Sequence, residues 1–239
     1  MKILSIGNSF SQDAQKYLHR LAKHNGVKMK TVNLYIGGCT MRTHYINNLD
    51  NNAAYSFEFN GETTGLRVSI REALASDNWD VVTLQQASHQ STKFETYEPY
   101  LSALAELVRT YCPHAKILMH GTWAYEEGSE RLANLGYESP RDMLSDALSA
   151  YRRAAETISA DGIIPSGEAM LAAIDAGIGK IHRDTFHASL GAGRYLIALT
   201  WYRTLTGNSI DGDSFNELDE PISAEERRIV ISAVKSVTE

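Results

Sequence analysis

Five short apolar runs alternate along the chain with longer segments whose apolar residues recur at helical spacing. The runs occupy residues 2–6, 31–36, 81–84, 116–119 and 162–164. Strands that alternate with helices in this way are typical of a parallel sheet covered by helices on both faces. Because right-handed crossovers leave few topologies, we predict a three-layer α/β fold with a five-stranded parallel sheet in the flavodoxin-like order 2-1-3-4-5.

The segments between the runs predict the helices, and one stretch predicts a hairpin. The expected helices span residues 12–24, 68–75, 97–111, 140–159, 166–176, 189–205 and 223–237. Residues 54–65 alternate in polarity and contain Asn60-Gly61, which favours a tight turn, so we predict a small β-ribbon inserted outside the main sheet. Because no repeat, low-complexity tract or linker interrupts the chain, we expect residues 1–239 to form a single domain.

Composition narrows the function classes. The hydrophobic share of 43% is ordinary for a globular protein, and a net charge of −6 argues against nucleic acid or anionic membranes as partners. No apolar run reaches the roughly 20 residues that span a bilayer. Residues 2–6 are too short for a signal-peptide core, so we expect a cytoplasmic protein. Cys39 and Cys112 form no metal or redox motif and favour a reducing compartment. The oligomeric state is not indicated.

Ser9 follows the first apolar run, within the turn Gly7-Asn8-Ser9 that leads into the first helix. Open α/β sheets gather ligands at the carboxyl ends of strands, and N–H groups at a helix start can hold a developing anion. The stretch Ser9-Phe10-Ser11-Gln12 also fits a capping box, in which a serine satisfies the helix donors. This stretch by itself therefore supports a nucleophile and a cap equally.

A second chemical motif lies near the end of the chain, where Asp184 and His187 are spaced Asp-x-x-His. This spacing lets a carboxylate curl back by one turn and orient an imidazole. That imidazole would remove the proton of a serine and make it a nucleophile. Two alternatives remain: His187 could be a core or helix-entry residue, and His182, Asp184 and His187 could form a metal site.

The order of the candidate residues along the chain favours catalysis. Ser9 follows the first strand, Gly37-Gly38 the second, Gln85 and Gln86 the third, and the Asp-x-x-His motif comes last. Because the carboxyl ends of parallel strands meet at one edge of a sheet, we expect these residues to be neighbours in space.

These motifs resemble those of the SGNH (GDSL-like) hydrolases. Ile6-Gly7-Asn8-Ser9-Phe10-Ser11 resembles the serine block, with Asn8 where many members carry Asp. Ile36-Gly37-Gly38-Cys39 resembles the second block, and Asp184-Thr185-Phe186-His187 the last. The third block departs from the family, because Leu84-Gln85-Gln86-Ala87-Ser88 replaces the usual Gly-x-Asn-Asp.

The resemblance implies the SGNH-hydrolase sheet order and a serine esterase mechanism. In that mechanism Ser9 attacks an ester carbonyl, His187 acts as base and then acid, and Asp184 orients His187. The backbone N–H groups of Ser9 and Gly38 would hold the oxyanion. We expect Gln85 to replace the missing asparagine, since a glutamine amide offers the same donor on a longer arm. No cofactor and no metal are implied.

The resemblance also suggests a substrate class. The whole pattern, including residues 200–207, is similar to an uncharacterised SGNH-like branch met in gut bacteria, and this resemblance suggests removal of an O-acetyl group from carbohydrate. We therefore expect a small-molecule or oligosaccharide ester as substrate. The residues that could contact it are Asn8, Gln86, Ser88 and Trp123. Loop aromatics such as Tyr125 and Tyr45 could stack on a sugar ring or simply pack.

Two rival functions stay open at this point. A lipid or aryl esterase would use the same catalytic parts with a different pocket. A non-catalytic binding protein of flavodoxin-like fold is the other. Nucleotide binding is disfavoured, because neither Gly-x-Gly-x-x-Gly nor a P-loop follows the first strand.

Overall fold

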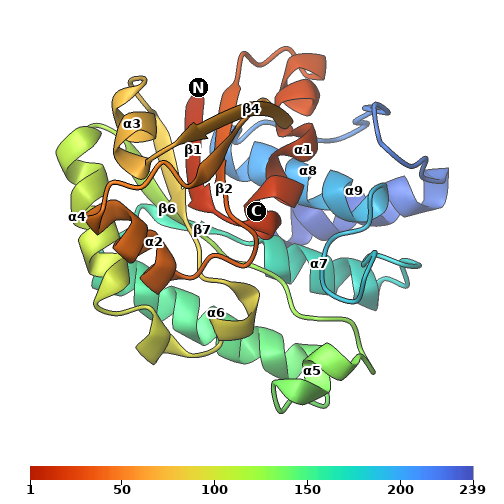
Figure 1. Ribbon diagram of the computed structural model, residues 1–239. Coiled ribbons are helices and arrows are strands. Elements are labelled where there is room, and N and C mark those ends of the chain that lie inside the picture. Colours follow the sequence, from red (N-terminus) through yellow and green to blue (C-terminus); the bar gives the residue numbers. More distant parts are fainter. Residues whose placement is uncertain (239) are drawn as a thin grey trace.

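The computed structural model describes residues 1–238, which form one mixed sheet with helices on both faces (Figure 1). The sheet has seven strands in the order β4-β3-β2-β1-β5-β6-β7. The strands are β1 (Lys2–Gly7), β2 (Lys30–Tyr35), β3 (Tyr55–Phe59), β4 (Glu62–Val68), β5 (Val81–Leu84), β6 (Lys116–His120) and β7 (Gly162–Ile164). The five predicted runs form the parallel part of the sheet in their predicted relative order, but the sheet itself is larger than predicted.

The two additional strands are the predicted hairpin. β3 and β4 pair antiparallel around Asn60-Gly61, as the turn signal indicated. The prediction that this ribbon lies outside the main sheet was wrong, because β3 also pairs antiparallel with β2. Buried Glu58 accepts a hydrogen bond from Asn33 Nδ2 at 2.8 Å, which joins the hairpin to β2. The hairpin thereby covers backbone groups of β2 that would otherwise form an open sheet edge.

Nine helices lie within residues 1–238. They are α1 (Ser9–His24), α2 (Met41–Leu49), α3 (Ile70–Ala75), α4 (Tyr100–Tyr111), α5 (Glu130–Asn134), α6 (Pro140–Thr157), α7 (Ser166–Asp175), α8 (Ala192–Thr206) and α9 (Ala224–Thr238), with short 3₁₀ turns at Ser88–Gln90 and Phe94–Thr96. The sequence did not predict α2 and α5. Both bury few side chains, so neither shows a regular apolar stripe.

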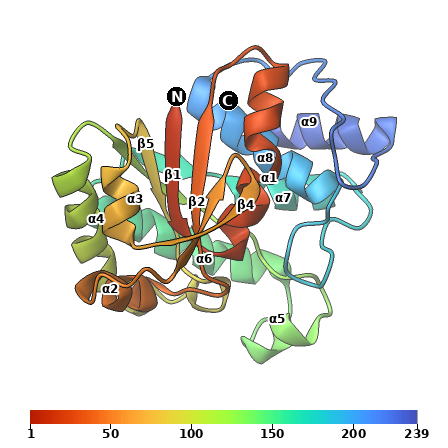
Figure 2. The same cartoon turned by 45° about the horizontal axis from the view of Figure 1, so that its top comes forward.

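The helices form two layers around the sheet. Helices α1, α7, α8 and α9 cover one face, and α2, α3, α4 and α6 lie toward the other (Figures 1 and 2). Successive residues of β1 serve the two cores, since Ile3 packs with the first group and Leu4 with the second. Helix α8 is buried nearly all round and packs against α1, α7 and α9. This packing places the start of α1 and the loop before α8 at the same edge of the sheet.

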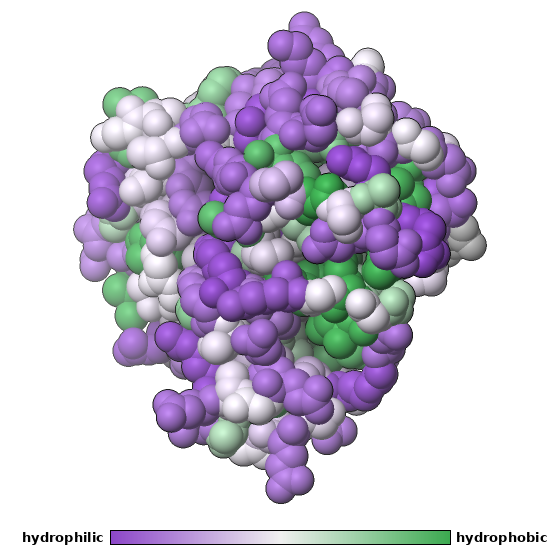
Figure 3. Space-filling view, turned by 90° about the vertical axis from the view of Figure 1, so that its right-hand side faces the viewer, coloured by the Kyte–Doolittle hydropathy of each residue, from purple (hydrophilic) through white to green (hydrophobic). Residues whose placement is uncertain are grey.

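Three further features of the fold concern its surface, its cysteines and the length of its helices. The side of the molecule that carries α7 to α9 is mostly hydrophilic, with apolar residues gathered in a limited region (Figure 3). Cys39 and Cys112 are buried and unpaired. Within residues 1–238, the helices are all too short or too polar to cross a bilayer.

Candidate active site

Helix α1 begins one residue earlier than the capping-box reading required. Asn8 is its N-cap: its side-chain oxygen accepts from Phe10 N at 3.1 Å, and Asn8 N donates to Ser11 Oγ at 3.0 Å. The cap therefore belongs to Asn8, and Ser9 is the first residue of the helix. Capping does not occupy the Ser9 hydroxyl. That hydroxyl is therefore free to bond to a side chain from the C-terminal part of the sequence.

Three side chains form a hydrogen-bonded line at this helix start. Ser9 Oγ lies 2.8 Å from His187 Nε2, and His187 Nδ1 lies 2.8 Å from Asp184 Oδ2. Asp184 Oδ1 also accepts from the backbone N–H of His187 at 2.9 Å. Partial burial acts to raise the pKa of Asp184, but the hydrogen bonds from the His187 ring and backbone outweigh it and hold that pKa below its usual range. An ionised Asp184 would favour the His187 tautomer whose Nε2 can accept a proton from Ser9.

A tight hairpin presents Asp184 and His187. An isolated antiparallel bridge joins His182 to Ala188, and Arg183 N donates to the His187 carbonyl at 3.0 Å. At the tip, Thr185 has φ +72°, a conformation that a β-branched residue rarely adopts. The Thr185 carbonyl accepts from the backbone of residue 126 at 2.7 Å, which holds the tip in place.

A buried carboxylate ties both ends of this hairpin to the helix that carries Ser9. Asp13 lies one turn after Ser9 and is fully buried. Its oxygens accept from Arg183 Nη1 at 2.9 Å and from Ala188 N at 3.1 Å. A further bond comes from Arg194 Nε at 2.9 Å, on α8. One side chain thus connects the residues directly before Asp184 and directly after His187 to α1. No local sequence pattern indicates this link, because its partners are far apart in the chain.

Two backbone N–H groups are available beside the Ser9 hydroxyl. Neither Ser9 N nor Gly38 N has a hydrogen-bond partner within residues 1–238. Gly38 has φ +63°, and a Cβ there would meet no atom within 4 Å. Backbone conformation, rather than space, therefore favours glycine at this position. Ser9 and Gly38 both line one pocket.

Gln85 is placed differently from the expectation. It is 1% exposed and does not line the pocket that contains Ser9. Its Nε2 donates to Asn8 Oδ1 at 2.7 Å, and its Oε1 accepts from His120 Nδ1 at 2.7 Å. Burial lowers the pKa of His120 to about 3, so this ring is neutral at ordinary pH. The glutamine amide is thus used to orient Asn8, whose own Nδ2 donates to the Cys39 carbonyl at 3.1 Å.

Gln86, a predicted substrate contact, is also engaged elsewhere. Its Oε1 accepts from Met41 N at 2.9 Å, and its Nε2 donates to the Thr96 carbonyl at 3.0 Å. These bonds hold the start of α2 and the 3₁₀ turn before α4 against the end of β5. Tyr45 packs against Tyr100 and does not line the pocket.

Ser88 and Trp123 have different placements. Ser88 lines the pocket, and its hydroxyl lies 2.9 Å from the Tyr125 hydroxyl. Trp123 is buried behind the pocket, where its ring stacks on Phe10 at 4.2 Å. Its Nε1 donates to the Phe186 carbonyl at 2.7 Å. Trp123 therefore supports the hairpin that carries Asp184 and His187 rather than presenting a surface to a ligand.

The pocket in front of Ser9, called the Ser9 pocket below, has a volume of about 340 Å³. It is lined by Asn8, Ser9, Phe10, Tyr35, Gly37, Gly38, Ser88, His89, Tyr125, Arg131, Phe186 and His187. Phe10, Tyr35, Arg131 and Phe186 were not predicted as part of the site. Phe10 directly follows Ser9 and Phe186 lies inside the Asp-x-x-His motif, so position could have suggested both. Arg131 lies in the unpredicted α5, and nothing in the sequence marks it.

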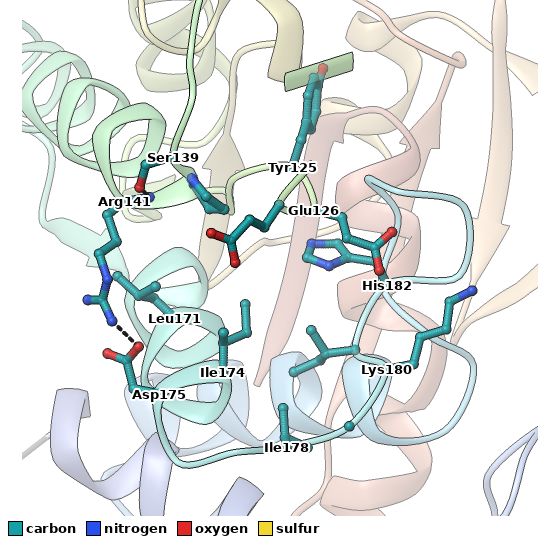
Figure 4. Close-up of a pocket in the computed structure, with 14 residues that line it drawn as sticks. Tyr125, Glu126, Ser139, Arg141, Leu171, Ile174, Asp175, Ile178, Lys180 and His182 are labelled. Carbon is teal, nitrogen blue, oxygen red and sulfur yellow. Dashed lines mark hydrogen bonds and ion pairs between the residues drawn. The ribbon is translucent and has the colours of Figure 1, made fainter. Parts of the chain in front are cut away.

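A second pocket of about 330 Å³ shares Tyr125 with the Ser9 pocket (Figure 4). Ile174 and Ile178 form part of its apolar wall, and Arg141 forms an ion pair with Asp175 at its edge. This second pocket thus combines an apolar wall with a charged rim, and Tyr125 is the residue that it shares with the Ser9 pocket.

His182, weighed as a metal ligand, lines this second pocket. Its Nε2 lies 3.1 Å from the Ala124 carbonyl, whereas Asp184 and His187 contact each other. Burial lowers the pKa of His182. Within residues 1–238, no three His, Cys, Asp or Glu side chains are grouped as metal ligands.

Comparison with known proteins identifies the family. The model of a family described as Domain of unknown function (DUF4886) matches residues 2–236. Among curated proteins, none matches the sequence. A crystal structure of a DUF4886 family protein from Bacteroides uniformis ATCC 8492 is 33% identical, with a TM-score of 0.91, and the match covers 99% of this chain and 93% of that chain.

Other solved structures share the fold at lower identity. A candidate SGNH hydrolase from Slackia heliotrinireducens is 26% identical, with a TM-score of 0.63, over 86% of this chain and 98% of that chain. The acetylxylan esterase Axe2 from Geobacillus stearothermophilus is 15% identical, with a TM-score of 0.58, over 84% of this chain and 92% of that chain. The resemblance to SGNH hydrolases is thereby confirmed. Because the family model spans nearly the whole sequence, this chain belongs to the DUF4886 family.

Proposed function

We propose that this protein is a serine esterase that works through an acyl-enzyme. The observation that carries the proposal is the unbroken line from Ser9 Oγ through His187 to Asp184, with both contacts at 2.8 Å. In the first half-reaction, Ser9 Oγ attacks the ester carbonyl carbon while its proton passes to His187 Nε2. The alcohol leaves with that proton. A water then attacks the acyl-enzyme by the same route, releasing the acid and restoring Ser9.

The oxyanion of both tetrahedral intermediates needs donors that are already in place. The unpartnered N–H groups of Ser9 and Gly38 supply two. For the third we propose Asn8 in place of Gln85, because Asn8 is the side-chain amide that lines the pocket. The bond from Gln85 to Asn8 Oδ1 turns the Asn8 nitrogen toward Cys39, and one of its two hydrogens remains for the oxyanion.

The pocket favours a short acyl group on a polar alcohol. Its lining combines the aromatic rings of Tyr35, Tyr125 and Phe186 with the polar side chains of Ser88 and His89. We propose an O-acetylated carbohydrate as the substrate. The fold shared with an acetylxylan esterase supports this class by analogy. A lipid esterase would need a longer apolar channel, and the polar wall disfavours it.

A chain-length series tests the proposed reaction. We expect turnover to be highest with 4-nitrophenyl acetate and to fall steeply through butyrate to octanoate. Acetylated xylo-oligosaccharide should release acetate, which an enzyme-coupled acetate assay would detect. A rise in kcat/KM toward octanoate would show that the protein is a lipid esterase instead. No turnover of any ester by the folded protein would contradict the proposal as a whole.

The Asn8→Asp variant tests the third oxyanion donor. The aspartate keeps an acceptor for the helix cap but replaces the amide donor with an oxygen facing Cys39. Removal of one oxyanion donor typically lowers kcat by roughly 100- to 1,000-fold, and we expect that loss with little change in KM. Gln85→Ala removes the bond that orients Asn8 and the bond with His120 but leaves the Asn8 amide in place, so its kcat should fall less. A larger loss of kcat in Gln85→Ala than in Asn8→Asp would show that Gln85, rather than Asn8, is the third donor.

A further inference from the structure

The charge of the Ser9 pocket rests on one side chain. Arg131 is the only arginine or lysine among the residues that line it, and no aspartate or glutamate lines it. Within residues 1–238, Arg131 forms no ion pair or hydrogen bond with another residue. The chain carries a net charge of −6, so this is a local exception to an acidic protein. Arg131 is itself exposed, so its guanidinium is accessible to a ligand that enters the pocket.

Arg131 is held in place without its polar groups being used. It lies in α5, which Ser129 caps by accepting from Leu132 N at 3.3 Å, and Leu132 is 1% exposed. The guanidinium lies 4.1 Å from the centre of the Phe186 ring, within cation–π distance. Phe186 in turn contacts His187, with ring centres 3.8 Å apart. The charge is therefore fixed over the catalytic hairpin by a contact that leaves its N–H groups free.

Tyr125 and Arg131 line the same pocket, and both contact the Phe186 ring. Burial raises the pKa of the Tyr125 hydroxyl, while its hydrogen bond with Ser88 and the positive charge of Arg131 act in the opposite direction. Ser88 and Tyr125 both line the pocket and lie 2.9 Å apart. Two hydroxyl groups and a guanidinium thus surround one part of the pocket, a combination suited to an anionic group.

We propose that Arg131 recognises a carboxylate on the substrate, so that the preferred esters carry a carboxylate close to the ester bond. This inference rests on the proposed esterase function and adds the substrate class. A guanidinium presents paired N–H donors that match the two oxygens of a carboxylate. An ester-linked acyl group on an acidic sugar, such as a uronate, has this chemistry.

Matched ester pairs test the inference on both sides of the ester bond. 4-Acetoxybenzoate and 4-acetoxybenzamide differ in a carboxylate on the alcohol part. The 4-nitrophenyl monoester of glutaric acid and 4-nitrophenyl pentanoate differ in a carboxylate on the acyl part. We expect the parent protein to prefer the charged member of at least one pair by about 10- to 100-fold in kcat/KM, the range of a charge-assisted hydrogen bond.

Variants at Arg131 assign that preference. Arg131→Gln should abolish the preference by raising KM for the charged ester, so that the charged and neutral members of a pair reach similar kcat/KM in this variant. Arg131→Lys should retain part of the preference for the charged ester. Arg228→Gln removes an arginine from an exposed ion pair on α9 and should leave the preference for the charged ester unchanged. Turnover without a charge preference, or a preference that survives Arg131→Gln, would overturn the inference alone. No turnover of any of the four esters would overturn the proposed function, and the inference with it.

Discussion

Replacing Ser9 with alanine is expected to abolish esterase turnover while leaving the fold intact. Loss of a nucleophile that acts with a histidine lowers kcat on the order of 10⁴- to 10⁶-fold. The helix cap belongs to Asn8, so Ser9→Ala removes no cap, and alanine is favourable at a helical position. We therefore expect thermal unfolding within a few degrees of the parent. Steady-state kinetics and circular dichroism on the same preparation would measure both effects.

The histidine provides the control for this prediction. Ser9 and His187 act as one unit, so His187→Ala should be about as damaging, and the double variant hardly worse than either single one. Asp184→Asn should cost no more than the loss of His187, because the imidazole remains in place. Independent, multiplicative losses in the double variant would show that the two side chains do not act together.

Replacing Asp13 with asparagine is expected to damage stability and catalysis together. Asp13 is fully buried and accepts from Arg183, Arg194 and Ala188. Breaking a buried ion pair costs about 3–5 kcal/mol, because it leaves the partner charge uncompensated. Loosening both ends of the hairpin should also displace His187 from Ser9. We therefore expect a lower kcat at little-changed KM under conditions where the variant is folded, measured beside urea unfolding.

The other carboxylate of the same network is a matched control. Asp219 pairs with Arg194 Nη1 at 2.8 Å, but its side chain is 38% exposed. Exposed ion pairs contribute about 0–1 kcal/mol, so Asp219→Asn should leave stability and kcat close to the parent. Equal behaviour of the Asp13 and Asp219 variants would show that burial of Asp13 does not decide the position of the hairpin.

Local patterns predicted most of the parallel sheet and the two motifs of the candidate active site. The run at residues 2–6, the turn at Gly7 and the following helix are encoded within a few neighbouring residues. The Asp-x-x-His spacing is equally local. Crossover rules then place these pieces at one sheet edge, which is why Ser9 and His187 could be expected together from opposite ends of the chain.

Features that depend on distant pairing could not be predicted. Asn60-Gly61 predicted a hairpin, but nothing local specifies that β3 pairs with β2. The capping box that fits Ser9 begins one residue after the actual cap, because Asn8 and Ser9 are both good N-cap residues and the local sequence does not distinguish them.

The side-chain contacts of the site also depend on residues that are far apart in the chain, so they could not be predicted either. Gln85 was assigned by its position after the strand, yet its amide orientation is set by His120 and Asn8, which come from other segments. Asp13 lacked any signal, because its arginine partners lie at the far end of the chain. Arg131 belongs to a helix too short to produce a periodic pattern.

Active-site labelling tests the central claim, that Ser9 is an activated nucleophile. A fluorophosphonate reacts readily with a serine whose proton is removed by a neighbouring base. We predict one phosphonate per chain, located on Ser9 by peptide mass spectrometry, with no label on Ser9→Ala and much slower labelling of His187→Ala. A folded parent protein that stays unlabelled, or that carries the label on another serine such as Ser88, would contradict the claim.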